Sequence, residues 1–308
     1  MFSLVVPVYE TSESLTHLLE ELDKLLPTIP DRVEVVFVVD GKPANTEFLR
    51  THLPGKAYQW QLITLSRNFG AWPATYAGLH RAKGDYIAAV SADLQEPPEL
   101  IAKFAEILRK GETEIVLARR DARSDPALAV LQSKLFYSMY RRFVVKEMPR
   151  GGVDTFAITR PVRDVLMNFK EADTNFVALL LWIGFRRQII SYDRAPRLHG
   201  ESSWGFARKL RQAFNSIFNF TDLPIQILLF AGSFGFLTAV VTGCIILVER
   251  IFGGTEVPGY AAIILALFFF GGLTSMGMGI LGQYLWLVLQ NVRTRPSYLI
   301  ESVNESNA

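Results

Sequence analysis

The sequence predicts an α/β domain built on a parallel sheet, followed by an anchor of two membrane-spanning helices. Over about the first 200 residues, short apolar runs rich in β-branched residues alternate with longer amphipathic runs, as in βα repeats. Farther on, two long stretches carry no charge, at residues 224–248 and 259–290. The chain of 308 residues is 50% hydrophobic, which is high for a soluble protein.

Five apolar runs have the composition of strands buried on both faces, and they cover residues 3–9, 33–40, 61–66, 86–93 and 114–119. Residues 12–26 and 97–110 have helical periodicity and lie between such runs. Ligands of parallel α/β sheets bind beyond the carboxyl ends of the strands. Glu10, Asp40 and Asp93 stand at three of these ends. We therefore expect the three carboxylates to face one crevice.

Beyond Arg120 the pattern is less regular. A basic helix is expected over residues 131–146 and a strand over residues 187–194. Residues 205–220 place their apolar side chains on one helical face, away from the basic ones, which predicts a helix lying on a membrane surface; an ordinary core helix is the alternative. The polar ending ESVNESNA is expected to be disordered.

Each uncharged stretch exceeds the roughly 20 residues that cross a bilayer, and buried core helices, which usually have a polar face, are the alternative. Basic residues precede the first stretch and follow the second, so the positive-inside rule places both chain ends in the cytosol. The first residues lack a basic lead, so no signal peptide is expected. The predicted organisation is a cytosolic domain at 1–203, an interfacial helix at 204–222, two transmembrane helices at 223–292 and a cytosolic tail at 293–308.

Composition excludes several kinds of site. Cys244 is the single cysteine, which rules out an intrachain disulfide or a thiolate zinc site, and the four histidines lack ligand spacing. A net charge of +2 without a basic run does not indicate nucleic acid binding. Carboxylates at strand ends instead suit Mg²⁺ or Mn²⁺ and a phosphorylated ligand. For Asp93 a second interpretation stays open, because an acidic residue before PPEL often caps a helix.

Several segments match longer motifs. SADLQEPPEL (91–100) resembles DADLQDPPE, VVPVYETSESL (5–15) resembles PVYNEEENL, and residues 65–87 resemble LSRNFGKExAxxAGxxxAxGD. Weaker matches are VVDGKPANT to VDDGSxDxT, GGVDTFAITR to GDFRLxxR, RAPRLHGESSWGFARKL to RxxRxxGxSKw, and RPSY to RPxY. These motifs, in this order, are similar to those of the polyprenyl-phosphate glycosyltransferases of glycosyltransferase family 2. The resemblance covers nearly the whole chain.

The resemblance implies a GT-A (Rossmann-like) fold and the inverting transfer of one hexose from a nucleotide sugar to polyprenyl (undecaprenyl) phosphate. A UDP-sugar is favoured as donor, and the setting would be the cytoplasmic membrane during cell-envelope glycan synthesis. Asp93 and Gln95 would hold Mg²⁺ or Mn²⁺ and the donor diphosphate. The residues that would contact the nucleotide are Pro7, Tyr9, Glu10, Asp40 and Arg67. Arg119, together with Lys134, would bind the acceptor phosphate, and the residues that would line the reaction centre are Asp154, Arg160, Arg194 and Arg197.

The chain also departs from the family motifs. Val39 and Ser91 stand in place of aspartates, Lys42 in place of a serine, Phe156 in place of an arginine and Ser203 in place of a lysine. These changes motivate an alternative, a catalytically weakened member that serves as a membrane scaffold or partner; transfer to a different lipid-linked acceptor is another. The sequence does not identify the sugar, and the glycine-rich stretch GGLTSMGMGILG would allow close helix packing, including between copies of the chain.

Overall fold

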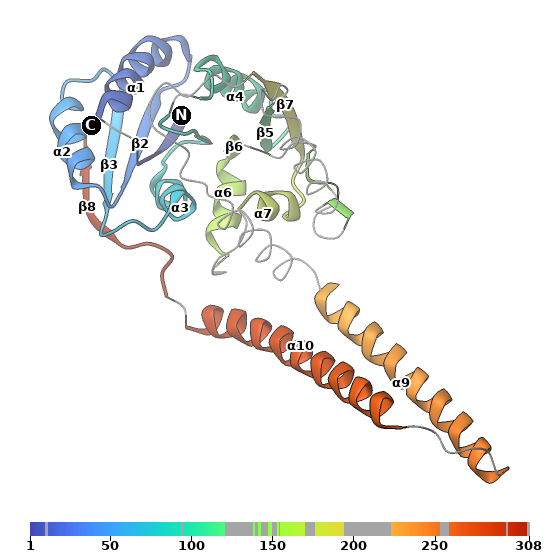
Figure 1. The fold of residues 1–308 in the computed structure, drawn as a ribbon. Coiled ribbons are helices and arrows are strands. Elements are labelled where there is room, and N and C mark those ends of the chain that lie inside the picture. Colours follow the sequence, from blue (N-terminus) through green and yellow to red (C-terminus); the bar gives the residue numbers. More distant parts are fainter. Residues whose placement is uncertain are drawn as a thin grey trace. The chain divides into compact units, whose positions relative to one another are not determined.

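A computed structural model shows two compact units, Met1–Lys209 with Arg295–Ala308, and Leu210–Thr294 (Figure 1). The structure describes residues 1–9, 12–93, 95–120, 138, 141–142, 147–149, 153, 155–169, 176–193, 223–252, 259–293 and 295–306. The expected basic helix at 131–146 lies almost entirely outside these ranges, and the expected interfacial helix at 205–220 lies wholly outside them.

The first unit is built on one eight-stranded sheet, ordered β7-β5-β6-β4-β1-β2-β3-β8. Its strands are β1 (Phe2–Val8), β2 (Val33–Asp40), β3 (Gln59–Leu65), β4 (Tyr86–Ala89), β5 (Ile115–Arg120), β6 (Thr155–Thr159), β7 (Arg187–Tyr192) and β8 (Ile300–Glu305). The five strands expected in the first 120 residues are all present, and so is the strand expected near residue 190. The expected strands all run in the same direction, whereas β6 and β8, which the sequence did not predict, run antiparallel to their neighbours and make the sheet mixed.

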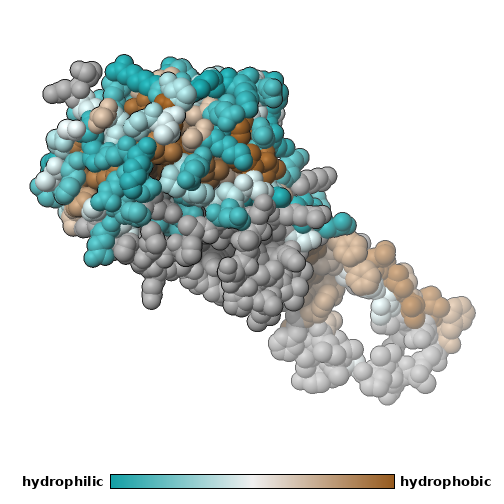
Figure 2. Space-filling view, turned by 90° about the horizontal axis from the view of Figure 1, so that it is seen from above, coloured by the Kyte–Doolittle hydropathy of each residue, from teal (hydrophilic) through white to brown (hydrophobic). Residues whose placement is uncertain are grey.

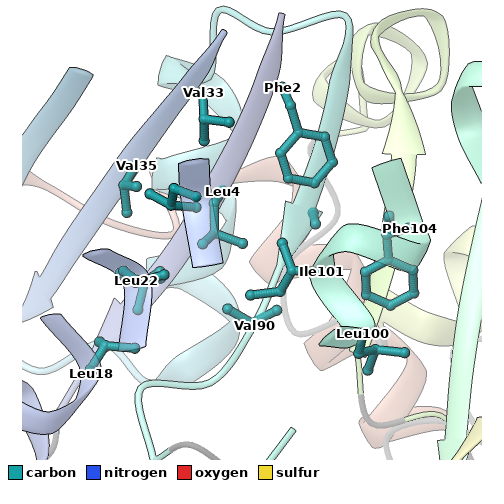
Figure 3. Packing of buried hydrophobic residues seen from close by; sticks show 14 of the residues in the cluster. Phe2, Leu4, Leu18, Leu22, Val33, Val35, Val90, Leu100, Ile101 and Phe104 are labelled. Carbon is teal, nitrogen blue, oxygen red and sulfur yellow. The ribbon is translucent and has the colours of Figure 1, made fainter. Parts of the chain in front are cut away.

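Helices cover both faces of this sheet. They are α1 (Ser12–Leu25), the 3₁₀ turn η1 (Leu26–Thr28), α2 (Pro43–His52), α3 (Ala71–Arg81), α4 (Glu99–Arg109), α6 (Arg160–Met167) and α7 (Phe176–Trp182). On one face, alternate side chains of β1 and β2 pack with α1 and α4 (Figure 3). On the other face, α3 lies so close that a Cβ on Gly78 would be 2.3 Å from Val5. All eight residues of β2 are buried, as predicted for a strand covered on both faces.

The second unit contains the two long apolar helices, α9 (Leu223–Ile251) and α10 (Tyr260–Val292). Stretches of 22 residues in α9 and 24 in α10 are long and apolar enough to cross a membrane. In the most apolar 18 residues of these stretches, only 6% and 11% are buried. The helices touch each other where Gly277 faces Leu228. Figure 2 shows mainly hydrophilic residues on the visible face of the first unit and hydrophobic residues along the second.

The end of the chain corrects one prediction. Disorder was expected for the last eight residues, but β8 pairs with β3 from Gln61↔Glu305 to Leu65↔Ile300. Ser306 extends the pairing, because its N–H donates to the carbonyl of Trp60 over 2.9 Å. Polar composition misled here, because a strand at a sheet edge is held by backbone hydrogen bonds that do not require apolar side chains.

Candidate active site

The sheet brings several of the singled-out residues to one edge. Strands β1 to β4 are mutually parallel, so Tyr9, Asp40, Arg67 and Asp93, which end or follow them, all lie at their carboxyl ends. The strand order reverses at β1, which has β2 on one side and β4 on the other. Such a switch point opens a crevice beyond the strands. Asp93 therefore lies where the ligand of an α/β sheet is expected.

Asp40 organises the loop that follows β3. Its Oδ1 accepts a hydrogen bond from the N–H of Phe69 over 2.7 Å, and its Oδ2 accepts one from the N–H of Gly70 over 2.8 Å. The side chain is only 3% exposed, and burial raises the pKa of Asp40, whereas these two N–H groups and the charge of Arg67 act in the opposite direction. Carboxylate oxygens can each accept more than one hydrogen bond, so the nucleoside contact of Asp40 stays a prediction.

Asp40→Ala should destabilise the fold by about 2 kcal/mol, because two backbone N–H groups lose their acceptor. Since folding raises the pKa of Asp40, its contribution to stability is full below the ordinary value of about 3.9 and declines as the pH rises through the native value. The difference in unfolding free energy between wild type and variant should therefore shrink from pH 4 towards pH 7. Thermal unfolding at several pH values measures this, and a difference that grows with pH would contradict the assignment.

Gly41 and Lys42 join this loop to the end of β1. Gly41 has a φ of 68°, and a Cβ there would lie 2.2 Å from the backbone nitrogen of Asn68. The Nζ of Lys42 donates to the carbonyl oxygen of Tyr9 and lies 4.0 Å from the centre of its ring. The segments after three adjacent strands thus form one continuous rim, and we call Tyr9, residues 40–42 and residues 66–70 the loop rim.

The loop rim presents two cations. Arg67 lies over the ring of Phe69, with its guanidinium carbon 4.1 Å from the ring centre. Within the described part of the chain, no carboxylate lies within salt-bridge distance of Arg67 or Lys42. Positive charge without a close acidic partner suits an anionic ligand. In the sequence, Lys42 stood out only as a departure from the family motif, and that departure was the available signal of its place in the loop rim.

Asp93 lies in a tightly closed loop. Its side chain is 6% exposed, and its Oδ1 accepts a hydrogen bond from the N–H of Gln95 over 3.3 Å. Glu96 closes the loop by accepting the N–H of Ser91 over 3.3 Å; it was not singled out in the sequence. Helix α4 begins at Glu99, with Pro98 at its N-cap position. The interpretation of Asp93 as the cap of this helix is therefore wrong.

The loop at Asp93 offers one carboxylate ligand for a hard cation, which is too few to hold the ion by itself. Within the described residues, no group of three or more His, Cys, Asp or Glu side chains could hold a metal ion. Asp93 offers a buried carboxylate, the ligand type that Mg²⁺ and Mn²⁺ prefer. Mg²⁺ is commonly held by one or two carboxylates with water and substrate phosphates completing its shell. The site thus fits a metal that arrives with, and is shared by, a diphosphate.

Arg119 lies at the same edge of the sheet as Asp93. It belongs to β5, which pairs in parallel with β7, and its Nε donates to the Oγ of Ser191 over 3.2 Å. Strand β6 connects the two regions, because Thr155 lies opposite Ala118 on β5 and donates its hydroxyl to the carbonyl of Ala89 on β4. Arg119 is only partly exposed.

Arg160 lies at the opposite edge, so its expected place in the reaction centre is wrong. Strand β6 ends at Thr159 opposite Tyr86, the first residue of β4. Arg160 follows it, donates from Nε to the carbonyl of Gly84 over 3.2 Å and pairs with Asp85 over 3.2 Å. Arg160 thus makes a structural ion pair at this opposite edge.

Phe156 replaces the family's arginine with an aromatic contact. The side chain is 2% exposed, and its ring centre lies 4.9 Å from that of Phe176 on α7. Trp72 and Tyr76 of α3 also pack on the ring of Phe176, with ring centres 5.4 and 5.3 Å from it. Val39, another departure, is fully buried in the core. Glu10, Lys134, Asp154, Arg194, Arg197 and Ser203 lie outside the described residues, and the roles expected of them stay predictions.

Comparison with known proteins then decides the family. Residues 3–170, more than half of the chain, match the model of glycosyl transferase family 2. The chain belongs to glycosyl transferase family 2. It is therefore a glycosyltransferase, and the resemblance noted in its motifs is confirmed.

Full-length relatives share this assignment. An uncharacterised glycosyltransferase of Synechocystis sp., sll0501, is 29% identical over 98% of this chain and 95% of its own. A prophage-derived bactoprenol glucosyl transferase of Shigella flexneri is 27% identical over 99% of both chains. The putative glycosyltransferase CsbB of Bacillus subtilis is 27% identical over 100% of this chain and 93% of its own.

A solved structure agrees with the fold of this glycosyltransferase. Glucosyl-3-phosphoglycerate synthase from Mycobacterium tuberculosis, solved with Mn²⁺, UDP and phosphoglyceric acid, superposes with a TM-score of 0.50 at 15% identity. The match covers 71% of this chain and 76% of that one. The predicted GT-A fold is confirmed as a GT-A-like mixed α/β sheet.

Proposed function

We propose that this glycosyltransferase transfers one hexose from a nucleotide sugar, with a UDP-sugar favoured, to the phosphate of a polyprenol such as undecaprenyl phosphate. The observation that carries the proposal is the gathering of Asp40, Arg67, Asp93 and Arg119 at one edge of the sheet. The Shigella flexneri relative named for bactoprenol supports the acceptor, because it matches 99% of this chain and so includes both apolar helices. Cell-envelope glycan synthesis is the proposed setting.

The donor is proposed to lie along the loop rim, with its diphosphate between Arg67 and Asp93. Asp93 and Gln95 would hold Mg²⁺ or Mn²⁺ there, and the ion would offset the negative charge that builds on the leaving diphosphate. Pro7, Tyr9 and Glu10 would contact the nucleoside side of the donor. Lys42 adds a cation close to Tyr9, and this cation would favour an anionic nucleotide.

The acceptor phosphate would need to be bound and oriented, but it would not need to be activated by a general base. A phosphate monoester has a second pKa of about 6, so it is already a nucleophile near neutral pH and needs no strong general base. One of its oxygens would attack the anomeric carbon in line, the bond from this carbon to the diphosphate would break, and the configuration would invert. Arg119 would hold the acceptor phosphate, and Asp154, Arg194 and Arg197 are proposed to line the reaction centre.

Two features support an anchor that crosses the membrane twice. Helices α9 and α10 each contain a stretch long and apolar enough to span a bilayer. Strand β8 follows α10 and pairs with β3, so the chain on both sides of the two helices belongs to one compact unit. Both ends of the anchor must then lie on the same side, which requires an even number of crossings. We place the domain at 1–203 in the cytosol, the interfacial helix at 204–222, the two spans at 223–292 and the tail at 293–308.

The direct test uses the full-length protein purified in detergent. Undecaprenyl phosphate, Mg²⁺ or Mn²⁺, and a panel of UDP- and GDP-sugars are added, and lipid products are followed by mass spectrometry. We expect one sugar–phosphoryl–lipid product, its loss on chelation of the metal, and none with the alcohol undecaprenol. Absence of product with every donor, from protein that remains folded, would favour the scaffold alternative. A product formed only on a lipid-linked saccharide would favour the other acceptor.

Arg119→Ala should raise the apparent KM for undecaprenyl phosphate by about tenfold or more, because a charge-assisted contact to phosphate is lost. The KM for the nucleotide sugar should change little. Lys103→Ala is the matched control, since Lys103 is an exposed cation of α4 that has no place in the proposed site. Steady-state rates with each substrate varied in turn supply the measurement, and an equal rise in both KM values would count against the role of Arg119.

A further inference from the structure

The final residues of the chain reach the loop rim. The N–H of Ser66, the residue next to Arg67, donates to the carbonyl of Leu299 over 3.0 Å. From this point the chain pairs with β3 as far as Ser306, with one irregularity between Thr64 and Leu65. We call residues 298–306 the closing segment. It continues the backbone pairing of β3 up to the first residue of the loop that Asp40 holds.

The closing segment also holds the helix that follows this loop. The hydroxyl of Tyr298 lies 3.0 Å from the Nδ1 of His80, in the last turn of α3. At the other end of the segment, Glu305 pairs with Arg81 over 2.5 Å and with Lys83 over 2.9 Å. The loop at 66–70 therefore lies between two elements, β3 and α3, that the same nine residues hold in place.

The contribution of the closing segment is local. Its side chains are mostly exposed, so removing it would uncover little of the core. Its removal would instead leave β3 at the edge of the sheet, with unpaired backbone groups along Gln61–Leu65. Local opening is favoured where a segment has few buried contacts and loses hydrogen bonds, and Ser66 and Arg67 are already exposed. The expected result is a looser loop on an intact core.

We propose that the closing segment is a positioning element of the nucleotide site, in which the pairing of β8 with β3 fixes the loop that carries Arg67. The proposal rests on the proposed function, since that function makes this loop part of the donor site. The proposal also makes a structural statement of its own: the residues that follow α10 hold a loop whose own residues lie more than 200 positions earlier in the chain. Tyr298 and Glu305 are then positioning residues that need not touch the donor.

The test compares the full chain with a variant lacking residues 298–308, both purified in detergent. Hydrogen exchange of the 66–70 amides and the affinity for UDP with Mg²⁺ are measured. We expect exchange at 66–70 to rise about tenfold or more, the Kd for UDP to rise about tenfold, and exchange in β1 and β4 to stay unchanged. A variant lacking only residues 307–308, which follow the segment, should behave as wild type.

Two single substitutions, each of which removes one negative charge, keep the test decisive if the shortened variant does not fold. Glu305→Gln breaks the ion pairs with Arg81 and Lys83, whereas Glu301→Gln removes a charge from the same strand that has no ionic partner among the residues that the structure describes. We expect Glu305→Gln to raise exchange at 66–70 and the Kd for UDP about two- to threefold, and Glu301→Gln to change neither. Equal values for both variants, or looser loops with unchanged UDP affinity, would overturn the proposal. A wild-type protein that binds neither UDP nor GDP with metal would instead refute the proposed donor.

Discussion

Asp93→Asn is expected to lower the transfer rate by about 10²- to 10³-fold while leaving the unfolding temperature nearly unchanged. The substitution removes the buried negative charge that would hold the metal and diphosphate, but keeps an oxygen that can accept the N–H of Gln95. The loop from Ser91 to Glu96 should therefore retain its shape. Initial rates at saturating metal and donor, together with thermal unfolding, measure the two effects separately.

Glu99→Gln is the matched control for this result. Glu99 is an exposed acidic residue six positions along, in the first turn of α4, and it has no place in the proposed site. Its substitution should change the rate by less than about twofold. If Asp93→Asn turns over as fast as Glu99→Gln does, Asp93 is not the metal ligand, and the oxygen donors must be sought elsewhere.

Gly41→Ala is expected to cost about 3 kcal/mol or more of stability and to weaken UDP binding at least tenfold. Two effects combine at this position. The φ of 68° disfavours any residue with a Cβ, and that Cβ would lie 2.2 Å from the nitrogen of Asn68 and 2.3 Å from the carbonyl carbon of Arg67. Both of these are backbone atoms, so the 66–70 loop must move away. Denaturant unfolding and calorimetric titration with UDP supply the measurements.

Gly111→Ala separates the two effects. Gly111 has a φ of 71°, but no atom of the described residues lies within 4 Å of an added Cβ, so only the backbone penalty of about 1–2 kcal/mol applies. UDP affinity should stay at the wild-type value. Equal losses for the two glycine variants would mean that the close approach of Gly41 to the loop contributes nothing.

The elements predicted well are those whose signal is local. The apolar runs of the sequence form β1 to β5, which are buried on both faces. The polar residues at the ends of these runs could therefore be assigned to the carboxyl edge of the sheet before the structure was known. The two uncharged stretches became α9 and α10 for the same reason, since length and hydrophobicity are read directly from the chain. The positions of Asp40 and Asp93 followed from these elements.

What could not be predicted depends on strand direction and on partners distant in sequence. Periodicity does not tell whether a strand runs parallel or antiparallel. Arg160 follows β6, and because β6 runs antiparallel to β4, that arginine lies beside Asp85 instead of at the site. Likewise, nothing in ESVNESNA indicates that its partner is β3, more than 200 residues earlier. The bonds from Asp40 to the 66–70 loop are of the same kind, since they join side chain to backbone across two strands.

Strand β8 also sets the order in which the protein can mature. Chains grow from the N-terminus at about 5–20 residues per second, and domains fold as they emerge. Strand β3 is made early, but its partner follows both apolar helices and lies within the last nine residues. The edge strand β3 therefore stays unpaired until the residues after α10 have been made, when both helices of the proposed anchor are already complete. A nascent chain that has not finished both helices lacks the strand that holds the 66–70 loop, so the proposed donor site is completed only after the proposed anchor has been made.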